Sequence, residues 1–308
     1  MPPTAPSVAS RCVSPLNVAI IINPVSGGAR PTAARANAEM AQAVASSRGV
    51  DAEIFLTKAA GHARELTAAA IARGVDRVIA WGGDGTINEV ASALAFGAVP
   101  MGIIPAGSGN GLARELGVPF DPRRALERAL GGSVRAIDLG EIEGRYFVNV
   151  AGIGLDAYVA SLFNNPANLR RGPRTYIALT LRALRSYRPL TYDIVTAEGR
   201  TTRTALLIVI ANGTEFGNRV LIARGARVDD GLLDVVIVEE RSRLATFCRL
   251  PWLLARSVHR VPVWSTRPAR EVVIEAAEAI VFHVDGEPVQ GGARVTARVH
   301  PGALTVVV

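Results

Sequence analysis

The first half of the chain alternates short aliphatic runs with longer segments of helical periodicity. The aliphatic runs predict strands at residues 17–22, 52–56, 77–81 and 101–104. A helix is predicted after each strand, over residues 32–45 and then in segments that end near residues 73, 96 and 116. Strands without polar alternation are typical of a parallel sheet that helices cover on both faces. Because such sheets bind ligands at the carboxyl ends of their strands, we look for the chemistry there.

After about Ile137 the pattern changes to alternating strands joined by tight turns, such as Glu143-Gly144 and Glu198-Gly199. Strands are predicted at residues 191–197, 206–211 and 232–239, and at the closing run 303–308, whose sheet the pattern does not assign. Two helices interrupt this half, at residues 174–187 and 244–258, and Pro251 is expected to kink the second one. The second half is therefore predicted to be mostly β.

Composition bounds these expectations without choosing a function. The 308 residues are 49% hydrophobic and 20% charged, which is enough apolar material for two ordinary cores. The formal net charge is +7, although Lys58 is the only lysine, and a basic surface favours an anionic partner such as a nucleotide or an acidic membrane. Nucleic acid is disfavoured, because the arginines are dispersed and aromatic residues make up only 5% of the chain.

The chain carries no sign of export or of membrane insertion. Residues 1–15 contain no apolar run of signal-peptide length and are expected to form a loose tail. No run approaches the roughly 20 apolar residues that a membrane span needs. Cys12 and Cys248 imply neither a disulfide framework nor a metal site. We therefore expect a cytoplasmic protein that meets a bilayer, if at all, from its surface.

Three glycine-rich turns follow strands of the first half. They are Asn23-Pro24-Val25-Ser26-Gly27-Gly28, Gly82-Gly83-Asp84-Gly85-Thr86 and Pro105-Ala106-Gly107-Ser108-Gly109-Asn110-Gly111. Glycine lets a backbone approach a polyanion, and the helix that follows each turn directs free N–H groups to the same place. One such turn is equally well an ordinary strand-to-helix connection, but three at one edge favour phosphate. Thr86 with Glu89 matches a capping box, which would start the helix there.

Asp84 narrows the chemistry of the central turn. An acid among phosphate-binding glycines repels phosphate unless it works through Mg²⁺ or orients a neighbouring group. The Gly-x-x-x-x-Gly-Lys-Ser/Thr arrangement of a P-loop is absent, and so is a dinucleotide fingerprint. The phosphate site is therefore of another type.

Four motifs in order resemble the diacylglycerol kinase catalytic-domain family, which includes bacterial lipid kinases and sphingosine and ceramide kinases. The motifs are Asn23-Pro24-x-Ser26-Gly27, Gly82-Gly83-Asp84-Gly85-Thr86-x-Asn88-Glu89, Gly107-Ser108-Gly109-Asn110 and Val284-Asp285-Gly286-Glu287. Gly-Gly-Asp-Gly alone is shared with NAD kinases and phosphofructokinases. The set, and above all the late Asp-Gly-Glu, is more specific.

This resemblance implies a Rossmann-like parallel α/β nucleotide domain and a mostly antiparallel β-sandwich domain, with a C-terminal strand that returns to the first domain. On this basis we expect a tail at residues 1–15, an ATP-binding domain at residues 16–136 and 296–308, and a lipid-substrate domain at residues 137–295. The resemblance also implies ATP and Mg²⁺ as cofactors and a cleft between the domains as the site.

The resemblance further implies roles for individual residues. Those expected around ATP are Asn23, Pro24, Ser26, Gly27, Thr57, Gly82, Gly83, Asp84, Gly85, Thr86, Asn88, Ser108 and Asn110. Asp84 is also expected to take part in catalysis. The Asp-Gly-Glu motif is expected to supply a base to the lipid hydroxyl, and Asp285 and Glu287 are both candidates that the sequence does not rank. Because Asp-Gly is a common turn pair, a plain surface hairpin is the alternative.

Two further acidic positions match the family. Asp230, with the main-chain carbonyl groups of Arg227 and Leu232, is expected to hold a structural Mg²⁺, for which hard oxygen ligands are suited. An ordinary β-turn is the alternative for this segment. Asp138 matches an acidic position near the crossing between the domains, and a strand-end cap is its alternative.

The lipid itself is left open. Bacterial diacylglycerol kinases commonly have Thr where Ser108 stands and Asp where Gly111 stands. Because this chain departs from that pattern at both positions, the expected substrate is either of the diacylglycerol type or of the sphingoid type. Arginines around the predicted helix 174–187 suggest a lipid partner at a membrane surface, and a core helix with a solvated basic face is the alternative. The oligomeric state is open, with a homodimer as one candidate.

Two other functions compete with the lipid kinase. A soluble-substrate kinase of the NAD kinase type explains the central turn but not the late Asp-Gly-Glu. A nucleotide-binding regulator that has lost turnover is the third reading, and the intact acids at the matching positions argue against it. His62, His259, His283 and His300 show no metal spacing or evident acidic partner, and they are assigned no chemistry.

Overall fold

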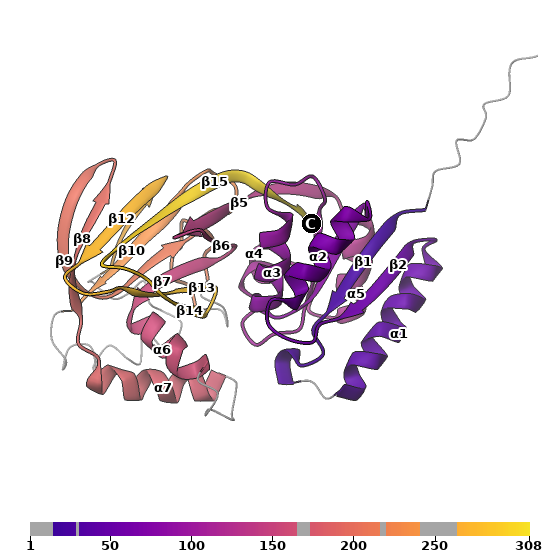
Figure 1. Cartoon of the computed structure of the whole chain (residues 1–308), viewed down its shortest axis with the longest axis horizontal. Coiled ribbons are helices and arrows are strands. Elements are labelled where there is room, and N and C mark those ends of the chain that lie inside the picture. The colour runs from indigo at the N-terminus through magenta and orange to yellow at the C-terminus, as the bar shows by residue number, and fades with distance from the viewer. Residues whose placement is uncertain (1–14, 29–30, 165–172, 216–219, 241–263) are drawn as a thin grey trace, which may run out of the picture.

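The computed structural model describes residues 15–28, 31–164, 173–215, 220–240 and 264–308. The predicted helix 244–258 and both cysteines lie outside these residues. Two lobes are joined by long strands, with the first half of the chain on the right of Figure 1 and the second half on the left. Among the described residues, no helix combines the length and the apolar character that crossing a bilayer requires.

The first lobe is a parallel sheet between two layers of helices. Its strands are β1 (Asn17–Ile22), β2 (Asp51–Leu56), β3 (Arg77–Gly82) and β4 (Met101–Pro105), in the order β2-β1-β3-β4. Its helices are α1 (Pro31–Ser47), α2 (His62–Ala72), α3 (Asp84–Leu94), α4 (Gly111–Glu115) and α5 (Pro122–Gly131), and a short 3-10 turn, η1 (Ser26–Gly28), follows β1. Helices α1 and α5 contact each other, as do α2 and α3. The predicted strands are confirmed to within one residue.

Strands β1, β3 and β4 are buried because helices cover both faces of the sheet, whereas the edge strand β2 is partly exposed. Ile20, Ile21 and Ile79 have no exposed surface, and Trp81 at the end of β3 is 1% exposed. Helix α5 was not anticipated, although its start carries a clear signal. Asp121 accepts a hydrogen bond from the N–H of Arg124 at 2.9 Å, and Pro122 occupies the first helical position.

The second lobe is antiparallel. Its strands are β5 (Val134–Ile142), β6 (Arg145–Phe147), β7 (Val150–Gly154), β8 (Leu190–Thr196), β9 (Gly199–Ala211), β10 (Leu233–Glu239), β11 (Trp264–Ala269), β12 (Glu271–Ala276), β13 (Val281–Val284), β14 (Glu287–Gln290) and β15 (Arg294–Val307). Helices α6 (Leu155–Asn164) and α7 (Pro173–Ser186) pack against each other at one end of it. Helix α7 confirms the predicted helix at residues 174–187, whereas α6 was missed.

Strand β15 connects the two lobes, as Figure 1 shows in yellow. It pairs with β12 and β5 in the second lobe, and near its end Val306 pairs in parallel with Met101 of β4. The C-terminal strand therefore returns to the first domain, as the resemblance implied. The sequence could not assign this strand, because an alternating pattern does not name its neighbour. The expected domain limits stay a prediction.

Asp138 fixes the point where β15 crosses between the lobes. It lies inside β5, is 3% exposed, and accepts hydrogen bonds from the N–H groups of Gly302 at 2.8 Å and Gly231 at 2.7 Å. Gly302 lies in the irregular stretch of β15 between His300 and Leu304. The alternative that Asp138 caps a strand end is therefore wrong, because its carboxylate joins three segments from within a strand.

Replacing Asp138 by Asn is expected to lower the free energy of unfolding by about 1–3 kcal/mol, measured by urea denaturation. The amide can accept through only one atom, so one glycine N–H loses its acceptor in a buried place. Asp51→Asn makes the same chemical change at an exposed position and should have little effect. Equal stability of the two variants would contradict the role assigned to Asp138.

Candidate active site

The three glycine-rich turns meet at the carboxyl edge of the parallel sheet. Ser26 in the first turn accepts a hydrogen bond through Oγ from the N–H of Gly83 in the second, at 3.2 Å. Asn23 donates from Nδ2 to Oγ1 of Thr86 at 2.9 Å. These bonds place the first turn directly beside the start of α3.

Glycine is needed here for the contact between turns. A Cβ on Gly107 would lie 2.6 Å from Cα of Gly83, which is closer than real Cβ atoms come. Gly27 has φ +65°, and a Cβ on it would collide with the carbonyl oxygen of Ala106. The glycines therefore serve the packing of the turns on one another as well as the approach of a ligand.

Asp84 organises the third turn. Its carboxylate accepts hydrogen bonds from the N–H groups of Asn110 and Gly111, each at 2.8 Å. Asn110 adopts φ +54° and is 2% exposed, and its side-chain oxygen accepts the N–H of Gly107 at 2.8 Å. Of the two roles that the sequence allowed for Asp84, orientation of a neighbouring group is the one that these hydrogen bonds describe.

The predicted capping box is wrong. Helix α3 begins at Asp84 with Gly83 as its N-cap, so Thr86 lies inside the first turn, where its hydroxyl faces Asn23. Glu89 instead accepts hydrogen bonds from the N–H groups of Gly61 at 2.8 Å and Ala63 at 2.9 Å, at the start of α2. The Glu89 carboxylate therefore caps the start of α2, which packs against α3, and does not cap the start of its own helix as the capping box predicts.

The start of α3 is suited to an anion. The described residues provide no acceptor for the N–H groups of Asp84, Gly85 and Thr86. A helix leaves its first N–H groups unpaired, and its dipole adds positive potential at that end. A phosphate group would satisfy both.

The Asp285-Gly286 pair forms a hairpin between β13 and β14, with φ +46° and +91°. The Asp285 carboxylate nevertheless points inward. One oxygen accepts hydrogen bonds from Nδ2 of Asn88 at 2.8 Å and from the N–H of Val148 at 2.9 Å. The other oxygen accepts the N–H groups of Asn149 and Val150 at 3.1 and 3.0 Å. The hairpin is thus tied both to α3 and to the start of β7.

Burial raises the pKa of Asp285 above the ordinary value of an aspartate, and its hydrogen bonds only partly oppose this. All four of its partners are N–H donors, which suit an accepting carboxylate. With both oxygens engaged, Asp285 has a structural position in this conformation.

Glu287 lies across from the start of α3. Its Oε1 is 3.5 Å from the position that a Cβ on Gly85 would take, and its side chain is exposed. No hydrogen bond to this carboxylate comes from the described residues. Partial loss of water raises the pKa of Glu287, the charge of Glu89 raises it further, and Arg145 and Arg64 oppose the rise. An available carboxylate therefore faces the anion site from the second lobe.

The remaining predicted ATP residues lie around the same edge. Thr57 directly follows β2, is 9% exposed, and donates its N–H to the carbonyl oxygen of Ile22 at 2.9 Å. Ser108 is exposed at the tip of the third turn. Asn88 holds Asp285 and also donates to the carbonyl oxygen of Tyr146 at 2.8 Å. The structure therefore brings the residues predicted from the first half together with the late hairpin.

The predicted Mg²⁺ segment is a tight turn before β10. Asp230 accepts the N–H of Leu232 through Oδ1 at 3.0 Å, and burial together with the charge of Asp230 raises the pKa of Asp234. Asp229 pairs with Arg135 at 3.2 Å and with Arg227 at 3.5 Å. The described residues contain no group of three or more His, Cys, Asp or Glu placed for a metal ion. One carboxylate with carbonyl oxygens still fits a hard cation in this acidic turn.

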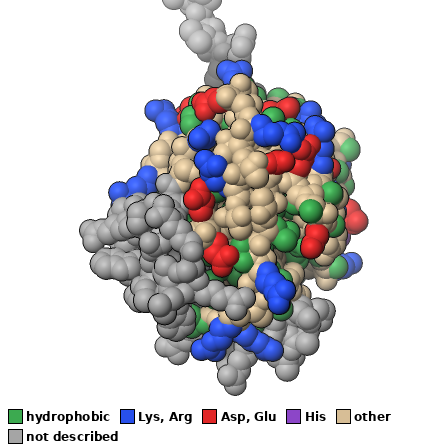
Figure 2. Space-filling model, turned by 90° about the vertical axis from the view of Figure 1, so that its left-hand side faces the viewer, with side chains coloured by type: hydrophobic (Ala, Val, Ile, Leu, Met, Phe, Trp, Pro, Cys, Tyr) green, Lys and Arg blue, Asp and Glu red, His purple; other side chains and the backbone are tan. Residues whose placement is uncertain are grey.

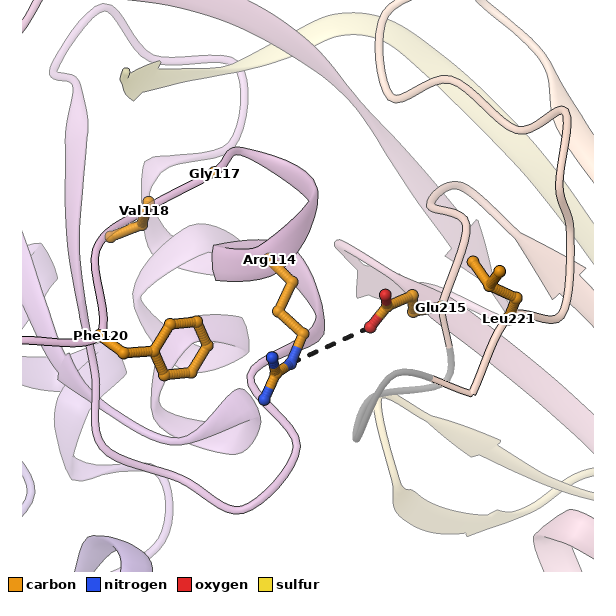
Figure 3. A pocket seen from close by; sticks show the side chains of 6 residues that line it. All are labelled: Arg114, Gly117, Val118, Phe120, Glu215 and Leu221. Atoms are coloured by element: carbon orange, nitrogen blue, oxygen red, sulfur yellow. Dashed lines mark ion pairs between the residues drawn. The ribbon is translucent and has the colours of Figure 1, made fainter. Parts of the chain in front are cut away.

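Figure 3 shows a pocket of about 390 Å³ between the lobes that the sequence did not reveal. Arg114 lies 4.5 Å from the ring centre of Phe120, donates from Nε to the carbonyl oxygen of Gly109 at 3.2 Å, and pairs at 4.0 Å with Glu215 of the second lobe. The pocket thus adjoins the third glycine turn. Its lining residues are Arg114, Gly117, Val118, Phe120, Glu215 and Leu221.

The departure at Gly111 has a structural counterpart. The side-chain amide of Asn149, from the second lobe, fills the space into which a side chain at position 111 would project. Asn149 donates from Nδ2 to the carbonyl oxygen of Glu215 at 2.5 Å. An aspartate at position 111 would therefore require Asn149 to move.

The expectation that the histidines lack acidic partners is wrong for two of them. His283 contacts Asp156 at 3.2 Å, and His300 contacts Glu141 at 2.6 Å. The residues of each pair are more than 100 positions apart in the sequence. No local spacing could have found them.

Comparison with known proteins covers nearly all of the chain. A family model described as the diacylglycerol kinase catalytic domain matches residues 17–142, and one described as the YegS C-terminal NAD kinase β-sandwich-like domain matches residues 149–308. The chain is 35% identical over 283 residues to a diacylglycerol kinase of Mycobacterium tuberculosis H37Rv, covering 88% of each. It is 36% identical over 278 residues to a "Probable lipid kinase YegS-like" of Pseudomonas fluorescens Pf-5, covering 88% of this chain and 90% of that one.

Solved structures support the same fold. Two crystal structures from Bacillus anthracis str. Sterne, one described as "a putative diacylglycerol kinase" and the other as a diacylglycerol kinase, align with TM-scores of 0.78 and 0.70. Their sequence identities to this chain are 23% and 21%, and the first alignment covers 98% of each chain. At such identities the likeness concerns the fold alone.

Proposed function

The chain belongs to the diacylglycerol kinase catalytic-domain family, and on that premise we propose that it transfers the γ-phosphoryl group of ATP to a hydroxyl group of a lipid. The observation that carries this proposal is the position of Glu287, an available carboxylate of one lobe that faces an unpaired helix start of the other. Phosphoryl transfer needs an anion site and a base within reach of the attacking hydroxyl. This cleft offers both.

In the proposed site the phosphates of ATP lie at the start of α3. Within residues 82–86, the unpaired N–H groups of Asp84, Gly85 and Thr86 bind the phosphates, and Gly82 and Gly83 form the turn before them. Lining the neighbouring strand ends are Asn23, Pro24, Ser26, Gly27 and Thr57, with Ser108 at the rim. Asn88, Asn110 and the Asp84 carboxylate act indirectly, because their side chains already hold the turns and the hairpin. Asp84 is therefore proposed to shape the phosphate site.

Glu287 is the proposed base. The lipid hydroxyl oxygen forms a bond to the γ-phosphorus as the bond from that phosphorus to the β–γ bridging oxygen breaks, ADP leaves, and the hydroxyl proton passes to the Glu287 carboxylate. Asp285 is less suited to receive this proton, since four N–H groups already surround its two oxygens. We propose that Asp285 instead holds the hairpin in place.

Mg²⁺ is proposed at two places. With ATP it would neutralise phosphate charge, as in other phosphoryl transfers. At the turn before β10, Asp230 with the carbonyl groups of Arg227 and Leu232 would hold a structural ion. The pKa of Asp234 is raised first by burial and then by the charge of Asp230, and a cation at the turn would offset that charge.

The lipid is proposed to be of the diacylglycerol or sphingoid type, presented at a membrane surface to a cytoplasmic enzyme that associates peripherally. Helix α7 is proposed to make this contact through its exposed arginines. Ala183 is buried, and the half-buried Leu179 and Leu184 pack against the same cluster as α6. Arg182, Arg185 and Arg188 are exposed. Figure 2 shows basic side chains gathered at the lower edge of this end of the molecule, at the height of α7 in Figure 1.

The first test is an assay of the purified protein with labelled ATP, Mg²⁺ and one acceptor at a time: diacylglycerol, sphingosine or NAD. We expect label in a lipid. Label in NAD would favour the soluble-substrate alternative, and nucleotide binding without any phosphorylated lipid would favour the regulator.

In the same assay Glu287→Gln should lower kcat by about 100-fold or more, the usual contribution of a general base, while Glu278→Gln at an exposed position should not. The base must be ionised, so activity should fall as pH drops through the pKa of Glu287. Because that pKa is raised, the midpoint should lie above the usual value of about 4.3. An unchanged kcat in Glu287→Gln would remove Glu287 from this role.

Mg²⁺ should raise the melting temperature of the protein without nucleotide, because a ligand that binds only the folded state stabilises it. Asp230→Ala should abolish this shift. Asp229→Ala, next to it but paired with arginines, should keep the shift. If Mg²⁺ raised the melting temperature of wild type and of Asp230→Ala equally, the proposal of an ion at this turn would be wrong.

Replacing Arg182 and Arg185 by Gln should weaken binding to vesicles that contain phosphatidylglycerol by roughly tenfold or more, given about 1 kcal/mol per basic residue at an anionic surface. Arg35 and Arg123, exposed on α1 and α5, serve as the matched pair whose replacement should change binding little. Unchanged vesicle binding after the α7 replacement would mean that α7 is a packed helix with a solvated basic face.

A further inference from the structure

Behind the hairpin that carries Glu287 lies a buried pair of side chains with no part in the proposed transfer. Nε2 of His283, in β13, is 3.2 Å from Oδ2 of Asp156, in the first turn of α6. The two residues are 3% and 6% exposed. A buried histidine and carboxylate in direct contact form a stiff unit, because neither has water as an alternative partner.

The other ring nitrogen of His283 faces the hairpin. The N–H of Gly286 donates to Nδ1 of His283 at 3.2 Å. A backbone N–H can only donate, so Nδ1 must be the unprotonated nitrogen, and Nε2 then carries the proton that Asp156 accepts. Asp156 is itself held, because its Oδ1 accepts the N–H of Ala157 at 2.9 Å. These hydrogen bonds link the N–H of Gly286, the imidazole of His283 and the carboxylate of Asp156 in α6 into one chain.

The second polar group of Gly286 is also held by α6. Nδ2 of Asn164, the last residue of α6, donates to the carbonyl oxygen of Gly286 at 2.8 Å. Gly286 itself is exposed and lies between Asp285 and Glu287 with φ +91°. An exposed glycine in a two-residue turn has wide conformational freedom, so these two bonds restrict the peptide groups on both sides of Gly286.

The fold makes room for this pair. Gly152 of β7 lies against it, and a Cβ on Gly152 would collide with both Oδ2 of Asp156 and Nε2 of His283. A larger residue in β7 would therefore displace the contact. The pair, the glycine beside it and Asn164 together form a support for the hairpin.

We propose that His283, whose ring contacts Asp156, is a positioning residue: its Nδ1 holds the N–H of Gly286 and thereby aims the carboxylate of Glu287 at the acceptor hydroxyl. This inference rests on the proposed function of Glu287. Groups that orient a reacting residue typically matter 10- to 100-fold, about the cost of a misplacement by roughly 1 Å. The role differs from simple stabilisation because it depends on one acceptor atom, Nδ1.

Two variants separate these roles. In His283→Asn the side-chain oxygen lies near the place of Nδ1 and can accept the N–H of Gly286. In His283→Gln the longer amide reaches toward Asp156 and leaves that N–H without its acceptor. We expect His283→Gln to lower kcat about 10- to 100-fold with KM for ATP changed less than about twofold, and His283→Asn to keep kcat within about threefold. Thermal unfolding of both variants shows whether they are equally destabilised.

A measurement that needs no activity accompanies the kinetics. Imidazole ¹⁵N spectra of wild type near neutral pH should show the Nε2–H tautomer of His283. The amide of Gly286 should exchange slowly in wild type and His283→Asn and faster in His283→Gln. The proposal would be overturned if both variants lost kcat equally and were equally destabilised. It would also be overturned if kcat of His283→Gln stayed within threefold of wild type.

The outcomes also separate this inference from the proposed function. If wild type phosphorylates lipid and both variants are equally active, the kinase function stands and the positioning role is rejected. If wild type labels no lipid, the proposed kinase function is rejected, and so is the catalytic role of His283. The spectra and the exchange rates then show whether the support itself exists.

Discussion

The contact on which the site depends is the carboxylate of Asp285, which accepts N–H groups from both lobes. Nδ2 of Asn88 belongs to α3, and the main-chain donors at residues 148–150 belong to the second lobe. Removing any one of these donors would leave part of a buried carboxylate without a hydrogen bond, which costs free energy. The four hydrogen bonds to Asp285 therefore stabilise the packing of the two lobes together. The start of α3 and the hairpin of Glu287 are thereby held at one separation, as the proposed phosphoryl transfer would require.

The same principle recurs along the junction. Asp138 joins β5 to the irregular part of β15 and to the turn before β10, while Asp84 joins α3 to the third glycine turn. Each of these acids is surrounded by backbone N–H groups, which do not change with side-chain substitution elsewhere. Because hydrogen bonds are directional, these carboxylates constrain the orientation of the segments that they join. The buried apolar residues form one large cluster around the parallel sheet and three separate clusters in the second lobe.

The acids of this protein divide by whether the fold has already satisfied them. Asp84, Asp138 and Asp285 each accept at least two hydrogen bonds and act as supports, whereas Glu287 keeps an available carboxylate at the cleft. The inferred support of His283 and Asp156 belongs behind this exposed acid. A reactive carboxylate needs freedom to take a proton, and it needs neighbours that limit where it points.

The sequence by itself determined the parallel sheet, the mostly β second half and the glycine-rich turns, because strand burial and turn chemistry are written in local patterns. It also brought Asp285 and Glu287 to attention, but it could not rank them, since their difference lies in donors from residues 88 and 148–150. The pair of His283 with Asp156 was missed for the same reason, because its members are far apart in the sequence. Only the tertiary structure decided three further contacts. These are the pairing of β15 with β4, the hydrogen bonds from the start of α2 to the Glu89 carboxylate of α3, and the position of the Asn149 amide beside Gly111. Contacts between distant segments have no spacing to read, because packing and hydrogen bonding choose the partners only when the chain is folded.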